Sequence, residues 1–425
     1  MIKKFILPIC FLFSLVSFAQ EGTSSPYSFY GIGDVKFKGT AENRAMGGLS
    51  IFSDSIHINI QNPAAYPGLK LTTFAIGGTY LTTKLKTSSQ EEKARRTAMD
   101  YLAIGIPMGK FGAGFGLIPY SSVGYKIQTV QNGPAPDSIQ TIKKYSGTGG
   151  LNKAFVGLGY KITPKFSIGA DLSYNFGKIE TSSLRFVEEV QYGSREKNVS
   201  DISGVTFTTG LMFQSKISDK LSIFSSMTFS PESNLKSKNA RKIGTIQYIA
   251  SGAEVVVDEE DIEVENSTIK LPAKFSFGAG IGESKKWMIG TEITYQKSSN
   301  SGNRFNDIIG NDIYEVHYEN AVKYNVGGYF IPNFNSFSNY WSKVTYRGGL
   351  RYENTGLVFD NEPINDVAMT LGLGFPISGV FSNINVGAEF GKKGTTNANL
   401  VQENYANISI GISLNDKWFK KTLYN

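Results

Sequence analysis

Side chains able to carry out catalysis are scarce in this chain of 425 residues. It has two histidines, His57 and His317, which lie far apart in sequence, and a single cysteine, Cys10, in an apolar N-terminal stretch. No Ser-His-Asp set can be assembled from residues on neighbouring elements. Each histidine is more readily explained by a structural or solvent hydrogen bond. The sequence therefore predicts a protein that is not an enzyme and uses no cofactor or metal.

Charged residues are numerous but are not arranged as a binding motif. The formal net charge is +7, yet no basic cluster is interleaved with aromatic residues, so we expect no nucleic-acid binding. The acidic run at 258–265 lacks the spacing of a calcium loop. We predict a solvated outer loop there, which divalent ions can bridge to lipopolysaccharide, and not a calcium-binding loop.

The N-terminus has the pattern of a secretory signal peptide. Lys3 and Lys4 precede an apolar stretch over 5–16, and Ser17 and Ala19 are the small residues before a cleavage site. This stretch is too short to remain as a membrane-spanning helix. We predict a signal peptide over 1–19, which leaves a mature chain without cysteine and therefore without disulfides.

From Leu69 onward, apolar and polar residues alternate in segments of about ten residues. In 406–414 every even position is apolar and every odd position is small or polar. This pattern puts one strand face in hydrocarbon and the other in a polar lumen. It predicts an all-β fold, a 14-stranded antiparallel transmembrane β-barrel in the cell outer membrane. The predicted strands are 69–84, 98–108, 111–127, 152–162, 166–180, 203–216, 221–230, 272–282, 287–297, 320–331, 343–357, 365–375, 383–393 and 403–414.

Links between these strands alternate between tight turns and long loops, such as 128–151, 181–202, 231–271 and 298–319. Short periplasmic turns and long outer loops are typical of such barrels. The barrel is thus predicted over 69–414, with a periplasmic tail over 415–425 and the three tryptophans on the periplasmic side. In each strand the apolar residues occupy every second position and mark the lipid-facing side, so the residues between them face the lumen. Ten charged side chains are placed in the lumen by this rule: Lys153, Lys161, Asp171, Lys274, Glu292, Lys323, Arg347, Arg351, Glu353 and Glu389.

Residues 20–68 do not alternate and instead carry two short motifs. Arg44 begins a stretch that ends in Gly47 and Gly48, and Asn62-Pro63-Ala64 follows. Asn62 can form an Asx-type turn and Pro63 fixes the backbone angle, so this region is shaped to fold back before the first strand. A barrel of fourteen strands is too wide to be filled by its own side chains. We therefore predict that 20–68 is a hatch inside the lumen; a simple turn is the alternative for Asn-Pro-Ala.

Here the chain resembles the FadL-type family of outer-membrane channels for long-chain fatty acids and other hydrophobic compounds. Specific residues match mainly in 41–69 and in the glycine-rich strands. The resemblance implies a hatch gated by Arg44, Gly47, Gly48, Asn62, Pro63 and Ala64. It also implies a lateral exit in the third strand near Gly114, Gly116 and Pro119, because proline cannot donate to a β-ladder. A harmless bulge at Pro119 is the competing interpretation.

Two functions remain open at this stage. The first is passive uptake of a hydrophobic small-molecule ligand, with gating by the hatch and sideways exit into the membrane. The second is a barrel that does not transport and serves as a structural or docking partner of another outer-membrane protein in a surface or secretion complex. In both cases we expect contact with outer-membrane lipid and lipopolysaccharide.

Overall fold

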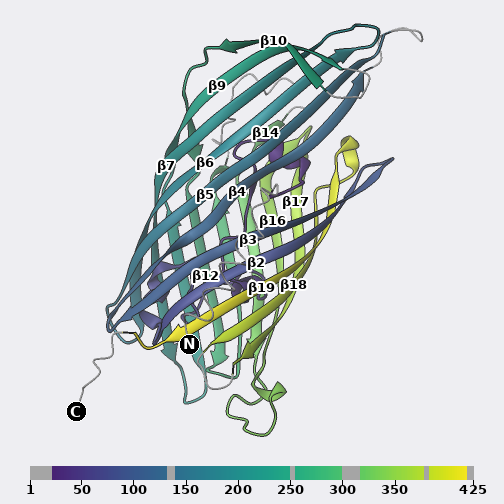
Figure 1. The fold of residues 1–425 in the computed structure, drawn as a ribbon. Coiled ribbons are helices and arrows are strands. Elements are labelled where there is room, and N and C mark those ends of the chain that lie inside the picture. Colours follow the sequence, from purple (N-terminus) through teal and green to yellow (C-terminus); the bar gives the residue numbers. More distant parts are fainter. Residues whose placement is uncertain (1–21, 132–138, 249–253, 299–315, 378–381, 419–425) are drawn as a thin grey trace, which may run out of the picture.

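A computed structural model describes residues 22–131, 139–248, 254–298, 316–377 and 382–418. The predicted signal peptide lies outside these residues, as does the end of the predicted tail. The described strands form a closed antiparallel barrel (Figure 1), in which the last wall strand pairs with the first from Gln402↔Lys86 to Asp416↔Thr72. None of the helices in the described ranges is long and apolar enough to cross a bilayer.

The wall consists of fourteen strands, as the sequence predicted. In order around the barrel they are β2 (Thr72–Lys86), β3 (Glu91–Met108), β4 (Phe111–Gln131), β5 (Thr141–Lys161), β6 (Phe166–Val187), β7 (Gly193–Lys216), β8 (Ser222–Ser230), β12 (Lys274–Glu283), β13 (Trp287–Gln296), β15 (Ala321–Phe330), β16 (Thr345–Phe359), β17 (Glu362–Pro376), β18 (Asn383–Lys393) and β19 (Gln402–Asp416).

The two faces of the wall differ as the alternation requires. In β19, Ile408 and Ile410 are 53% and 51% exposed on the outside, whereas Ser409 and Ser413 are 2% exposed. Placing Lys or Arg on a lipid-facing surface costs about 2–4 kcal/mol near the bilayer midplane. The polar residues therefore face inward and the apolar side chains form the outer surface.

The short turns gather at one end of the barrel, which is the periplasmic end in proteins of this architecture. Gly109 makes one of them with a left-handed φ of +72°. Trp287 opens β13 opposite Phe330 at this end. Trp341 lies in the short helix η5 (Trp341–Lys343) between β15 and β16, and Trp418 follows β19. The three tryptophans are therefore at the same end, as the strand order predicted.

At the outer end, the sheet continues beyond the predicted strands on one side (Figure 1). Residues 231–271, predicted as a loop, instead contain β9 (Ser233–Tyr248), β10 (Glu254–Ile262) and β11 (Ser267–Leu271). Strand β9 pairs with the outer half of β7, and β10 and β11 fold back on β9. The acidic run belongs largely to β10, where Glu259 forms an ion pair with Arg195 at 2.7 Å. The loop prediction was wrong because sheet outside the membrane is not required to alternate. Two smaller elements at this end are β14 (Val316–Tyr318) and η6 (Asn397–Asn399).

Residues 22–71, called the N-terminal segment below, precede the first wall strand. They contain η1 (Pro26–Phe29), β1 (Asp34–Val35), α2 (Ala41–Arg44) and η2 (Pro63–Gly68). Contacts with inward-facing residues of the wall place this segment inside the barrel (Figure 1, purple). Leu49 and Ile51 of this segment are fully buried and pack in one cluster with Phe224 of β8 and Met288 of β13.

Candidate functional site

The helix η2 rests on a patch of wall that lacks side chains. A Cβ atom at any of five inward-facing glycines would overlap η2 or its cap residue Asn62. These glycines are Gly112 and Gly114 of β4, Gly159 of β5, Gly169 of β6 and Gly210 of β7. Glycine permits this close approach of two backbones. The sequence showed that several strands are rich in glycine, but not which part of the N-terminal segment these glycines accommodate.

Asn62 fixes the start of η2. Its backbone is extended, its Oδ1 accepts a hydrogen bond from the Ala64 N–H at 3.0 Å, and Pro63 occupies the first helical position. This is the usual arrangement of an N-cap followed by a proline that needs no partner for an N–H. The carbonyl of Ala64 then accepts from the Ser167 hydroxyl of β6 at 2.7 Å. Asn62, Pro63 and Ala64 thus form one buried turn attached to the wall.

Arg44 connects the N-terminal segment to two wall strands, β3 and β18, which lie on either side of the paired strands β2 and β19. Its guanidinium lies 3.3 Å from Asp100 of β3 and 3.8 Å from Glu389 of β18. The ring of Phe37 lies 5.0 Å away as a cation–π partner. A buried charge is tolerated only when it is paired in this way.

Gly47 and Gly48 turn the chain after α2 with left-handed φ values of +69° and +94°. Only glycine adopts such values without a steric penalty. The Gly47 N–H donates to the Thr370 hydroxyl of β17 at 2.9 Å. A Cβ at Gly349 of β16 would overlap the backbone of Gly47. The two glycines therefore allow the turn and its contact with the wall.

The wall is interrupted between β3 and β4. These strands pair only from Met108↔Phe111 to Leu102↔Leu117. Beyond that point β3 continues to pair with β2, and β4 with β5, but no β3–β4 pairing is present among the described residues. Figure 1 shows the two strands diverging toward the outer end. The family resemblance implied an exit near Pro119 in the third strand, with a bulge as the competing interpretation. Pro119 lies just past the last β3–β4 pair and beside a bulge in the β4–β5 ladder.

The two predicted exit glycines have different neighbours. Gly114 faces the ring of Tyr66 in η2, whereas a Cβ at Gly116 would overlap the carbonyl oxygen of Leu102. Gly114 therefore contacts the N-terminal segment, and Gly116 lies where β3 and β4 are still joined.

The N-terminal segment crosses this gap. Strand β1 pairs with β4 at Asp34↔Ser122 and Val35↔Ser121, in the position that β3 would occupy in an uninterrupted wall. The Lys36 N–H adds a hydrogen bond to the Tyr120 carbonyl at 3.0 Å. On the other side, the Arg96 Nε of β3 donates to the Thr23 carbonyl at 3.5 Å. Strand β1 was not predictable from the sequence, because two residues are too few to show an alternation of apolar and polar positions.

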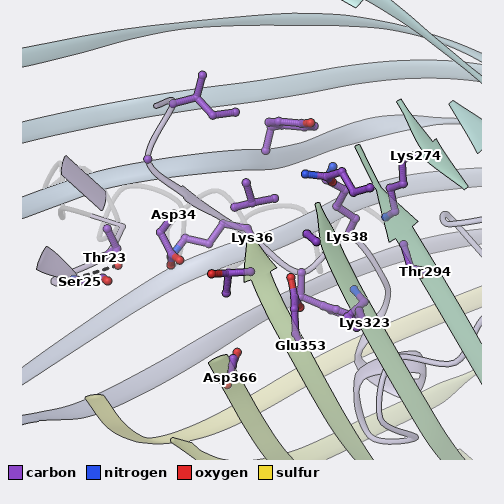
Figure 2. A pocket seen from close by; sticks show the side chains of 18 of the residues that line it. Thr23, Ser25, Asp34, Lys36, Lys38, Lys274, Thr294, Lys323, Glu353 and Asp366 are labelled. Atoms are coloured by element: carbon purple, nitrogen blue, oxygen red, sulfur yellow. Dashed lines mark hydrogen bonds and ion pairs between the residues drawn. The ribbon is translucent and has the colours of Figure 1, made fainter. Parts of the chain in front are cut away.

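A cavity of about 440 Å³ lies between the segment and the wall (Figure 2). Eight of the ten charged residues predicted to face the lumen line it: Lys153, Asp171, Lys274, Glu292, Lys323, Arg351, Glu353 and Glu389. One side contains paired charges. Arg351 lies 3.0 Å from Asp366 and 2.8 Å from Glu389, and Lys393 lies 2.7 Å from Asp34. Burial would raise the pKa of Asp34, but the ammonium groups of Lys393 and Lys36 outweigh it and lower that pKa to about 2.

A family model matches the whole chain, and several solved structures share its fold over about nine tenths of its length. The BamG family model matches residues 1–425. The chain belongs to the BamG family. Among solved structures, the toluene transporter TbuX of Ralstonia pickettii is 13% identical with a TM-score of 0.59, covering 89% of this chain and 99% of its own. The toluene transporter TodX of Pseudomonas putida is 16% identical with a TM-score of 0.59, covering 91% and 100%.

A FadL homologue of Pseudomonas aeruginosa also matches, at 12% identity and a TM-score of 0.56, covering 91% of this chain and 99% of its own. No curated protein sequence matches the chain. At these identities the structural likeness shows the fold, which is the FadL-type fold that the Asn-Pro-Ala motif indicated. Together with the apolar outer face, it identifies a multi-pass outer-membrane β-barrel.

Proposed function

We propose that this barrel is a passive outer-membrane channel for hydrophobic compounds, including long-chain fatty acids, and that the N-terminal segment is its hatch. The observation that carries the proposal is the end of the β3–β4 ladder at Leu117, where the hatch crosses the resulting gap. Cargo enters from the outer end, the hatch shifts, and cargo leaves sideways through the gap. TbuX and TodX, which have this fold, are described as toluene transporters.

The gating step has a modest energetic cost. Releasing β1 from β4 breaks a few backbone hydrogen bonds, each worth about 0.5–1.5 kcal/mol in net stability. The wall ladders elsewhere remain intact. In this mechanism Asn62, Pro63 and Ala64 hold η2 in place while the outer part of the hatch moves. Arg44 is the tether, and Gly114, Gly116 and Pro119 border the exit.

A reversible cross-link between hatch and wall tests this gate. Val35 and Ser121 are register partners, and antiparallel partners have Cα separations of about 4.5–5.5 Å, which a disulfide can span. In the double variant Val35→Cys/Ser121→Cys, uptake of a hydrophobic fluorescent probe should fall under oxidising conditions and recover on reduction. The control is Thr129→Cys/Lys143→Cys, a register pair between β4 and β5, where the disulfide should leave uptake unchanged. Equal uptake by oxidised and reduced Val35→Cys/Ser121→Cys would refute the gate.

The sheet that extends beyond the membrane on one side supports a second candidate function, that of a docking partner for another outer-membrane protein. Its last strand, β10, exposes Val255, Val256 and Val257 at 42%, 42% and 53%. Within the described chain β10 pairs with β9 alone, and such edges can pair with another strand. If a strain without the protein takes up the probe normally, the docking function becomes the better explanation. In either function, the apolar outer face contacts lipid, and the outer rim contacts lipopolysaccharide.

A further inference from the structure

Four lysines from different parts of the chain line one side of the cavity. Lys38 belongs to the N-terminal segment, and Lys153, Lys274 and Lys323 come from β5, β12 and β15. Figure 2 shows Lys38, Lys274 and Lys323 grouped with Glu353, away from the paired charges around Asp34. The sequence predicted that the three wall lysines face inward, but not that they converge with Lys38.

In the part of the chain that the structure describes, no carboxylate pairs with any of these four ammonium groups. Within the described ranges, none of the four forms an ion pair or a side-chain hydrogen bond, although each ammonium has three donors. Lys38 has one other contact, with its Nζ 3.8 Å from the centre of the Tyr120 ring. Burial lowers the pKa of Lys38 well below its usual range, and repulsion from Lys274, Lys153 and Lys323 lowers it further, while Glu353 opposes this effect.

The carboxylates on this side do not compensate the lysines fully. Glu292 accepts hydrogen bonds from the backbone and hydroxyl of Ser50 at 3.0 and 2.7 Å. Asp171 accepts a hydrogen bond from the Tyr66 hydroxyl at 3.1 Å. Glu353 is the remaining carboxylate and makes no side-chain hydrogen bond within the described chain. Buried or half-buried cations of this kind are normally satisfied by an acceptor.

We propose that Lys38, Lys153, Lys274 and Lys323 form a binding site for a polyvalent oxyanion such as a phosphate or pyrophosphate group. A ligand with one carboxylate group has too few oxygens to contact four ammonium groups. The oxygens of a phosphate or pyrophosphate ligand can contact several lysines at once, because each ammonium acts as a point charge without a fixed direction. Thr294, which also lines the cavity and lies near Lys274 in Figure 2, shares a hydrogen bond of 2.9 Å with the Ser276 hydroxyl. This proposal is argued from the lysines that line the cavity, and it does not require that the barrel transports a hydrophobic compound.

Binding at this site would also hold the N-terminal segment in place. Lys38 follows β1 by three residues and is the one member of the cluster on the segment. An oxyanion bridging Lys38 to the wall lysines would therefore favour the seated position of β1, because it binds that state and not a displaced one. Hydrogen exchange in residues 34–40 reports this effect separately from affinity.

The test is a titration of the full chain in detergent with sodium pyrophosphate at constant ionic strength, followed by calorimetry and hydrogen exchange. We expect saturable binding, protection of residues 34–40, and about tenfold weaker binding in each of Lys38→Gln and Lys274→Gln. Lys274→Arg should retain most of the affinity, since it keeps the charge. The control Lys238→Gln alters an exposed lysine of β9 and should bind as the parent does.

A second titration distinguishes the source of the oxyanion. Dioctanoyl phosphatidic acid in the same detergent replaces pyrophosphate. Lysine-dependent binding that is tighter for the lipid indicates a lipid headgroup, and tighter binding of pyrophosphate indicates a soluble phosphate; both support the site. Absence of saturable binding of either probe, or equal affinity in the parent, Lys38→Gln and Lys274→Gln, overturns it.

Discussion

The side-chain amide of Asn62 donates a hydrogen bond from Nδ2 to the carbonyl oxygen of Leu211 in β7, at 3.2 Å. The same side chain caps η2 through Oδ1 and the Ala64 N–H. One fully buried residue therefore fixes the local turn and joins it to the wall. This double role explains why the Asn-Pro-Ala motif can be read both as a turn and as an anchor.

Replacing Asn62 with alanine should loosen η2 without unfolding the barrel. The variant loses the cap and leaves the Leu211 carbonyl without this donor, a combined cost of about 1–3 kcal/mol to the seating of η2. We expect faster hydrogen exchange over 62–68 and, under the proposed function, lower uptake of a hydrophobic probe. Barrel abundance and heat resistance should stay as in the parent. Asn335→Ala, at an exposed position, is the control, and unchanged exchange in Asn62→Ala would contradict the anchoring role.

Neighbouring glycines of β16 offer a matched test of how closely the segment approaches the wall. A Cβ at Gly349 would overlap the Met46–Gly47 backbone, whereas a Cβ at Gly348 would have its nearest neighbour at 3.8 Å. Gly349→Ala should therefore displace residues 45–49 and expose them to limited proteolysis, while Gly348→Ala should not. The same protease pattern in both variants would mean that the segment does not depend on this contact.

Deleting residues 20–68 tests whether the segment blocks the lumen. The fourteen wall strands pair with one another without help from the segment, so the truncated chain should fold into a heat-resistant barrel. A lumen of this width, freed of its contents, should conduct ions strongly in planar bilayers. Equal conductance of the full and truncated chains would show that these residues are not a plug.

The wall strands, and therefore their number, were predictable because the bilayer imposes one pattern of apolar and polar residues on each of them. Each wall strand must present apolar side chains to lipid at every second position, and this local rule is readable along the sequence. Strand β19 follows it from Asn407 to Leu414. The prediction failed where the chain leaves the membrane, at β9 and β10, because no lipid face constrains that sheet.

The site was predictable only in part, because its geometry depends on non-local pairing. Parity placed Lys153, Lys274 and Lys323 in the lumen, but their convergence on Lys38 depends on where the segment lies. Likewise, Pro119 marked the third strand as unusual, yet the length of the β3–β4 ladder is set by the divergence of two strands. A local sequence pattern determines neither how close residues of different strands lie nor how many residues of two strands pair.

Protonation of His57 should make the seating of the N-terminal segment depend on pH. The Nδ1 of His57 lies 2.6 Å from Oδ2 of Asp54. Burial alone would lower the pKa of His57, but the Asp54 carboxylate outweighs it and the net shift is upward. Burial would raise the pKa of Asp54, but His57 and nearby backbone N–H groups lower it. The ion pair therefore needs a protonated His57 and an ionised Asp54.

The sign of the effect follows from these two shifts. Because the folded pKa of His57 lies above its unfolded value of about 6.5, its contribution is complete below that pH and is lost as the pH rises through the folded pKa. Asp54 contributes above its unfolded pKa of about 3.9, and its contribution is lost as the pH falls through its folded pKa. After correction for intrinsic rates, exchange over 52–60 should be slowest between about pH 4 and 6.5 and should increase toward pH 9. His57→Gln removes the titrating group and should abolish the increase in exchange between about pH 6.5 and pH 9, called the alkaline limb. An alkaline limb of equal slope in parent and variant would assign the pH dependence to another group.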